Sequence, residues 1–85
     1  MKLADNEERA LKRLRGELFA RCPIIDFRLY GSKVRGEGSQ DSDLDVMIEI
    51  PEYDRAMVAE IDDIVYRINI EHRVNLFSTQ VLDFT

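Results

Sequence analysis

The sequence contains no tryptophan, a single cysteine and no long run of apolar residues. Because Cys22 is the only thiol, neither an internal disulfide nor a cysteine-based metal cluster can form, and we expect Cys22 to be a reduced packing residue. No stretch approaches the roughly 18 apolar residues of a membrane span, and no segment resembles a secretion signal. We therefore expect a cytoplasmic protein that does not enter a membrane.

Composition and length predict one small globular domain. Apolar types make up 45% of the 85 residues and charged types 34%, which is typical of a soluble domain and unlike disordered or fibrous chains. A chain of this length cannot assemble two separate hydrophobic cores, and neither a repeat nor a linker interrupts it. We expect a single domain over residues 1–85.

The net charge of −5 argues against general nucleic-acid binding. The charge is unevenly distributed, since residues 1–38 carry nine Lys and Arg against six Asp and Glu, whereas residues 39–85 carry three against eleven. Two interpretations stay open. The polarity suits a site where cationic groups meet phosphate oxygens opposite a carboxylate-held metal, and it equally suits solvated helix faces of different charge.

Two segments have apolar residues at spacings of three and four, which predicts amphipathic helices. The first covers residues 5–21, with Asp5 or Asn6 as its N-cap and Pro23 as its stop. The second covers residues 53–69 and is followed by a polar turn containing His72, which we expect to be solvated.

Alternating apolar and polar residues predict three strands, over residues 24–30, 43–50 and 74–81. A loop or short helix joins the first two strands, so the order is helix, strand, loop or helix, strand, helix, strand. The economical arrangement is a two-layer α+β fold in which two long helices cover one face of a small mixed three-stranded sheet. The other face of the sheet is then free to hold a site.

Asp43 and Asp45 are the first candidate functional residues. They are two positions apart on a predicted strand, so they emerge from one face with Cα atoms about 6.6 Å apart. Left without a partner, two such carboxylates repel each other, so the arrangement favours a bound cation or a basic side chain beside them. A Lys or Arg could fill this role, but a small set of oxygen ligands suits Mg²⁺. An aspartate-rich turn before a strand is the plain alternative.

A calcium loop is a second alternative for this segment. Asp41, Asp43 and Asp45 match its first, third and fifth positions and Glu52 its twelfth. The sixth position requires a glycine and is Val46, within an alternating strand, so we reject this interpretation.

The segment after the first strand is the predicted phosphate side of the site. Gly31 permits close approach of the backbone to a ligand, and Ser32 can donate from its hydroxyl and cap a following helix turn. A helix that begins there would direct free N–H groups at an anion, and Lys33 and Arg35 add positive charge.

Gly31-Ser32, ten further residues and then Asp43-x-Asp45 resemble the signature of the DNA polymerase beta-like nucleotidyltransferase superfamily, in particular its minimal nucleotidyltransferase branch. The resemblance covers nearly the whole chain. It implies that Gly31 and Ser32 hold the phosphates of a nucleoside triphosphate such as ATP, and that Asp43 and Asp45 bind two Mg²⁺ ions for in-line phosphoryl transfer.

The resemblance also implies an acceptor. Minimal nucleotidyltransferases are often antitoxins paired with a HEPN-domain toxin, to which they transfer AMP from ATP. A chain of 85 residues has little room for an acceptor domain. We therefore expect a HEPN-type partner protein or a second copy of the chain, as a homodimer, to complete the acceptor site.

The sequence departs from the family pattern at one position. Active members usually place a third carboxylate on the next strand, where this chain has Asn75, whose amide cannot act as a base and is a weaker Mg²⁺ ligand. Asp83 lies too far along the chain to replace it. The alternative function is therefore a catalytically weakened binding module of the same fold, an antitoxin that acts by docking.

Overall fold

The computed structural model describes residues 3–30 and 44–82, which form two helices and three strands in the predicted order. The helices are α1 (Asp5–Arg21) and α2 (Arg55–His72), and the strands are β1 (Asp26–Tyr30), β2 (Leu44–Glu49) and β3 (Leu76–Val81). The loop or short helix expected between the first two strands lies outside the described residues. Neither of the two helices is long and apolar enough to cross a membrane.

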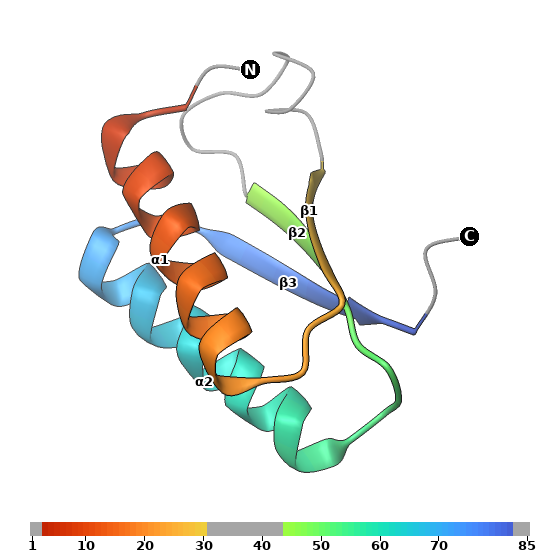
Figure 1. Ribbon diagram of the computed structural model, residues 1–85. Coiled ribbons are helices and arrows are strands. Elements are labelled where there is room, and N and C mark those ends of the chain that lie inside the picture. Colours follow the sequence, from red (N-terminus) through yellow and green to blue (C-terminus); the bar gives the residue numbers. More distant parts are fainter. Residues whose placement is uncertain (1–2, 31–43, 83–85) are drawn as a thin grey trace.

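The three strands form a mixed sheet in the order β1-β2-β3. β1 and β2 are antiparallel, with Tyr30 opposite Asp45, and β2 and β3 are parallel, with Asp45 opposite Phe77. Both helices lie on one side of this sheet (Figure 1). The predicted two-layer α+β fold is therefore confirmed.

The hydrophobic core lies between the helices and the sheet. The alternation predicted for β2 is confirmed, because Leu44, Val46 and Ile48 are fully buried whereas Asp45 is exposed. The helices contribute the other half of the core, including Leu14 and Leu18 of α1 and, from α2, Ile61, Ile64 and Ile68. The alternation of the first predicted strand placed Ile25, Phe27 and Leu29 on one face. This was wrong for Ile25, which precedes β1 and is exposed, while Phe27 and Leu29 are partly buried against the core.

The predicted N-cap of the first helix was also wrong. The cap is Ala4, whose N–H donates to the Glu7 carboxylate at 3.0 Å. The side chain of Asn6 instead donates to the carbonyls of His72 and Arg73, at 3.1 and 3.3 Å. These bonds join the start of α1 to the end of α2, and a capping rule based on sequence alone does not foresee them.

The second helix begins and ends later than the sequence predicted. Asp54 is its N-cap and accepts hydrogen bonds from the N–H groups of Ala56 and Met57, at 2.9 and 3.3 Å. The helix continues to His72, which is half-buried rather than solvated, and Arg73 then adopts a left-handed conformation with φ of 55°. This turn reverses the chain into β3.

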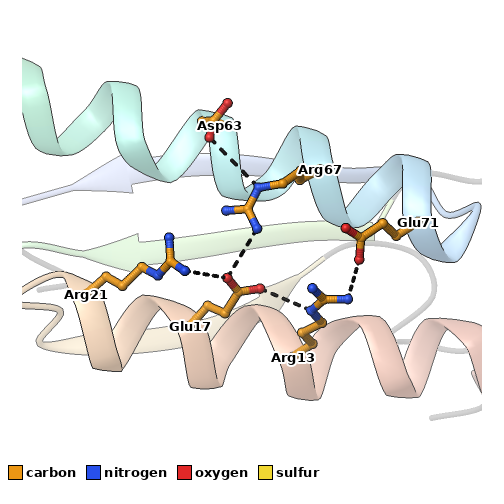
Figure 2. A network of polar contacts seen from close by, with 6 residues as sticks. All are labelled: Arg13, Glu17, Arg21, Asp63, Arg67 and Glu71. Carbon is orange, nitrogen blue, oxygen red and sulfur yellow. Dashed lines mark hydrogen bonds and ion pairs between the residues drawn. The ribbon is translucent and has the colours of Figure 1, made fainter.

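A network of ion pairs joins the outer surfaces of the two helices (Figure 2). The Glu17 carboxylate lies 3.2 Å from Arg13, 3.6 Å from Arg21 and 3.5 Å from Arg67. Arg13 also pairs with Glu71. Because Arg13 meets Glu71 while Glu17 meets Arg67, α1 and α2 are antiparallel, and the charged pairs hold their register although each exposed pair is individually weak.

Candidate functional site

The sheet face turned away from the helices, here called the outer face, carries the described part of the predicted site. Alternation along the strands places on it Asp26, Arg28, Tyr30, Asp45, Met47, Glu49, Phe77, Thr79 and Val81. The pairing arranges these residues in rows across the three strands, the first being Tyr30, Asp45 and Phe77.

Asp45 is the one predicted site residue that the structure describes. Its side chain is exposed on the outer face near the start of β2, and in the described part of the chain no cation pairs with it. The other predicted site residues lie outside the described residues: Gly31, Ser32, Lys33, Arg35 and Asp43. Their roles therefore stay predictions.

Aromatic side chains flank Asp45 on both neighbouring strands. Tyr30 is 39% exposed at the end of β1, and Phe77 is 60% exposed on β3. Directly opposite residues on neighbouring strands have Cβ atoms about 5 Å apart, so both rings border the carboxylate. The position of these two rings beside Asp45 was not predictable from the sequence, because it depends on strand pairing rather than on spacing along the chain.

The described residues on either side of segment 31–43 lie at the same end of the sheet. The segment follows Tyr30 and precedes Leu44, and Tyr30 is paired with Asp45. Asp45 thus lies at the end of the sheet where the chain enters and leaves this segment. The same end holds the start of β3, because the Leu44 N–H donates to the Asn75 carbonyl at 2.8 Å.

Asn75 occupies the position at which the family resemblance implies a third carboxylate. It is exposed and immediately precedes β3. The residue of β3 in register with Asp45 is Phe77, and β3 itself, Leu76–Val81, contains no carboxylate. Within the described residues there is also no group of three His, Cys, Asp or Glu side chains arranged to hold a metal ion.

Asn69 fixes the start of β3 and was not anticipated from the sequence. Its side-chain amide donates to the Leu76 carbonyl at 3.0 Å and accepts from the Leu76 N–H at 2.8 Å. This two-bond contact imitates a neighbouring strand and orders the backbone beside Asn75. An asparagine near the end of a helix is the only sequence signal, and it does not identify the partner.

Asn69→Ala is expected to lower the free energy of unfolding by about 1–2 kcal/mol, because both backbone groups of Leu76 lose their partner. Urea denaturation followed by circular dichroism measures this change. Ile70→Ala, at the next and exposed position of α2, is the control and should have a much smaller effect. Equal losses for the two variants would contradict the proposed contribution of Asn69.

Asp26 lies at the far end of the outer face, and Arg28 lies in its middle row. The Phe27 N–H and then the Arg28 guanidinium, at 2.9 Å, stabilise the Asp26 carboxylate and lower its pKa. The hydrogen bond from Arg28 to Asp26 raises the pKa of Arg28 in turn. Asp26 lies opposite Glu49, two rows from Asp45. Arg28 lies in the row between them, and a hydrogen bond with Tyr30 also raises its pKa, so Arg28 connects this ion pair to the row that contains Asp45.

Comparison with known proteins identifies a family. The model of a family described as a nucleotidyltransferase domain matches residues 11–80, from within α1 to within β3. No curated protein and no solved structure gives a significant match.

Proposed function

The chain belongs to the nucleotidyltransferase domain family, and from this premise we propose that it transfers AMP from ATP to a hydroxyl of an acceptor protein. The general activity, nucleotidyl transfer from a nucleoside triphosphate, follows from the family. The choice of ATP and of a protein acceptor, such as a HEPN-type toxin, is our proposal. The observation that carries the proposal is the exposed Asp45 carboxylate at the sheet end where segment 31–43 begins and ends.

The donor chemistry of the chain fits a divalent cation. Asp45 supplies an exposed carboxylate that has no cationic partner among the described residues, and hard cations such as Mg²⁺ prefer such oxygen ligands. Asp43 and Asp45 would hold the ion, which neutralises triphosphate charge and favours attack by the acceptor oxygen when it is bound.

The remaining predicted residues would bind and orient the nucleotide. Gly31 and Ser32 would contact the phosphates, and Lys33 and Arg35 would add the positive charge that a triphosphate requires. The aromatic rings of Tyr30 and Phe77 border Asp45 and would limit the access of water to its carboxylate. None of these residues is a carboxylate, which distinguishes the site from one with a third carboxylate as general base.

Transfer of a labelled nucleotide tests the function. The protein is incubated with Mg²⁺, the product of the neighbouring gene, and ATP labelled on either the α- or the γ-phosphate. AMP transfer places the α-label on the acceptor and leaves the γ-label in pyrophosphate. Label on protein from γ-labelled ATP alone would indicate phosphoryl transfer and contradict the proposal, and so would the absence of both labels.

The alternative function is docking by a weakened enzyme, and Asn75 is the observation that favours it. Its exposed amide lies at the start of β3, where the resemblance implies a carboxylate. In this case the chain would bind the partner and neutralise it without transferring a nucleotide. Complex formation that is unaffected by ATP, together with no label transfer, would favour docking.

Asn75→Asp is expected to raise the rate of label transfer by at least about tenfold, because a carboxylate at this position can accept the proton of the attacking hydroxyl. The initial rate at saturating ATP measures the change. Gln80→Glu is the matched control, since it makes the same amide-to-acid change on β3 but on the helix-facing side. An unchanged rate for Asn75→Asp, or an equal rise in Gln80→Glu, would contradict a role for position 75.

A further inference from the structure

β3 is an edge strand that presents backbone hydrogen-bonding groups away from the sheet. Leu44 and Ile50 donate their N–H groups to the carbonyls of Asn75 and Val81, at 2.8 and 2.9 Å, so the odd-numbered residues of β3 direct their backbone groups to β2. The even-numbered residues direct theirs to the opposite side, because backbone groups alternate along a strand.

The hydrogen bonds of Leu76 are independent evidence that the even-numbered residues direct their backbone groups away from β2. Its N–H and carbonyl both bond to the side chain of Asn69 rather than to β2. Asn69 thus covers the first pair of outward groups, whereas no described residue pairs with the backbone groups of Ser78 and Gln80. The uncovered part of the edge therefore begins after Leu76.

The edge of β3 lacks the features with which proteins block strand pairing. Its sequence, LFSTQV, contains no charge, proline or glycine. β1, the other edge strand, carries the ion pair between Asp26 and Arg28, and its Phe27 N–H is bonded to the Asp26 carboxylate at 2.8 Å. One edge of the sheet is thus protected by charge, and the other is not.

We propose that β3 pairs in antiparallel fashion with β3 of a second copy of this chain, around a two-fold axis at Thr79. The uncovered backbone groups select this register. Ser78 lies opposite Gln80 of the second copy, and these two residues exchange two backbone hydrogen bonds. Gln80 and Ser78 of the second copy exchange two more. Four backbone hydrogen bonds form in total, and none requires the groups of Leu76 that Asn69 already occupies.

The side chains of the strand are self-complementary in the same register. On the outer face, Thr79 meets Thr79 across the axis, and Phe77 meets Val81 of the second copy on each side. Thr–Thr and aromatic–β-branched pairs are among the favourable cross-strand contacts. On the helix-facing side Ser78 meets Gln80, and these two polar side chains already lie 3.4 Å apart within one chain.

The proposed pairing extends the row of residues that contains Asp45 into the second copy. Asp45 is opposite Phe77, and Phe77 would be opposite Val81 of the second copy, so the row continues across the interface. The exposed Phe77 ring becomes covered, and the two sheets form one of six strands, a common size. Both outer faces then lie on the same side. The pairing itself does not depend on nucleotide transfer.

Position-specific disulfide formation tests the register. In a Cys22→Ala background, Thr79→Cys places two thiols at a non-hydrogen-bonded pair with Cα atoms about 4.5 Å apart, within the range of a disulfide. We expect a covalent dimer under mild oxidation. Val81→Cys is the matched control, because four positions would separate the two residues, about 13 Å along the strands, and no disulfide should form. Equal or greater cross-linking through Val81, or none through Thr79, would overturn the proposal.

Sedimentation equilibrium of the full chain tests association without cross-links. Wild type is expected to be dimeric at ~100 µM, and Thr79→Lys to weaken the dimer at least about tenfold, because it places like charges opposite each other on the axis. Tyr66→Lys introduces the same charge at a side chain of α2 that is 66% exposed, and it should leave the dimer unchanged. A monomeric wild type, or equal weakening by both variants, would overturn the proposal. Circular dichroism verifies that each variant is folded.

Discussion

Asp45→Asn is expected to reduce the rate of AMP transfer by about 100-fold or more. The exchange removes one negative charge and replaces a carboxylate oxygen by an amide, which binds Mg²⁺ more weakly, while the size of the side chain is unchanged. Because Asp45 is exposed on the outer face, no packing contact should be lost. The rate of label transfer at fixed Mg²⁺ and ATP concentrations measures the effect, and titration calorimetry measures the affinity for Mg-ATP.

Asp62→Asn is the matched control for this prediction. Asp62 is also exposed, but it lies on α2 in the helix layer. The variant changes the net charge by the same amount and should transfer AMP at the wild-type rate. If Asp45→Asn transfers as fast as wild type, or if Asp62→Asn is equally impaired, Asp45 does not bind the catalytic cation.

The helices, the strands and the two faces of the sheet were predictable because their signals are local. Spacings of three and four between Leu14, Leu18 and their neighbours follow from the turn of a helix, and the alternation between Asp45 and Val46 follows from the pleat of a strand. In the structure Leu14, Leu18 and Val46 are buried and Asp45 is exposed, as these patterns predict.

The contacts that depend on tertiary structure were not predictable. Asn6 was expected to cap α1, but it bonds to carbonyls at the end of α2. Asn69 was assigned only to a helix, yet it fixes the start of β3. In both cases the partner is a backbone group that any residue could supply, so the sequence contains no complementary signal.

The sequence predicted which face of its strand Asp45 occupies, but not which residues of the neighbouring strands lie beside it. The sequence placed Asp45 on an exposed strand face, and the structure agrees. It did not reveal that Phe77 is the direct neighbour of Asp45, because strand order and register depend on how the helices pack. The contribution of Asp43 and of Gly31, Ser32, Lys33 and Arg35 stays a prediction that the variants and binding measurements test.

Ile48→Ala is expected to lower the free energy of unfolding by about 3 kcal/mol, because it removes a large side chain that is 0% exposed between sheet and helices and leaves a cavity. In a domain this small, such a loss is a large part of the total stability. Urea denaturation measures it, and Asp45→Asn on the same strand but the opposite face should change the value by less than about 0.5 kcal/mol. If Asp45→Asn were as destabilising as Ile48→Ala, its loss of transfer would reflect unfolding instead of a missing ligand. The prediction that the buried face of β2 contributes stability and its exposed face contributes ligand binding would then be wrong.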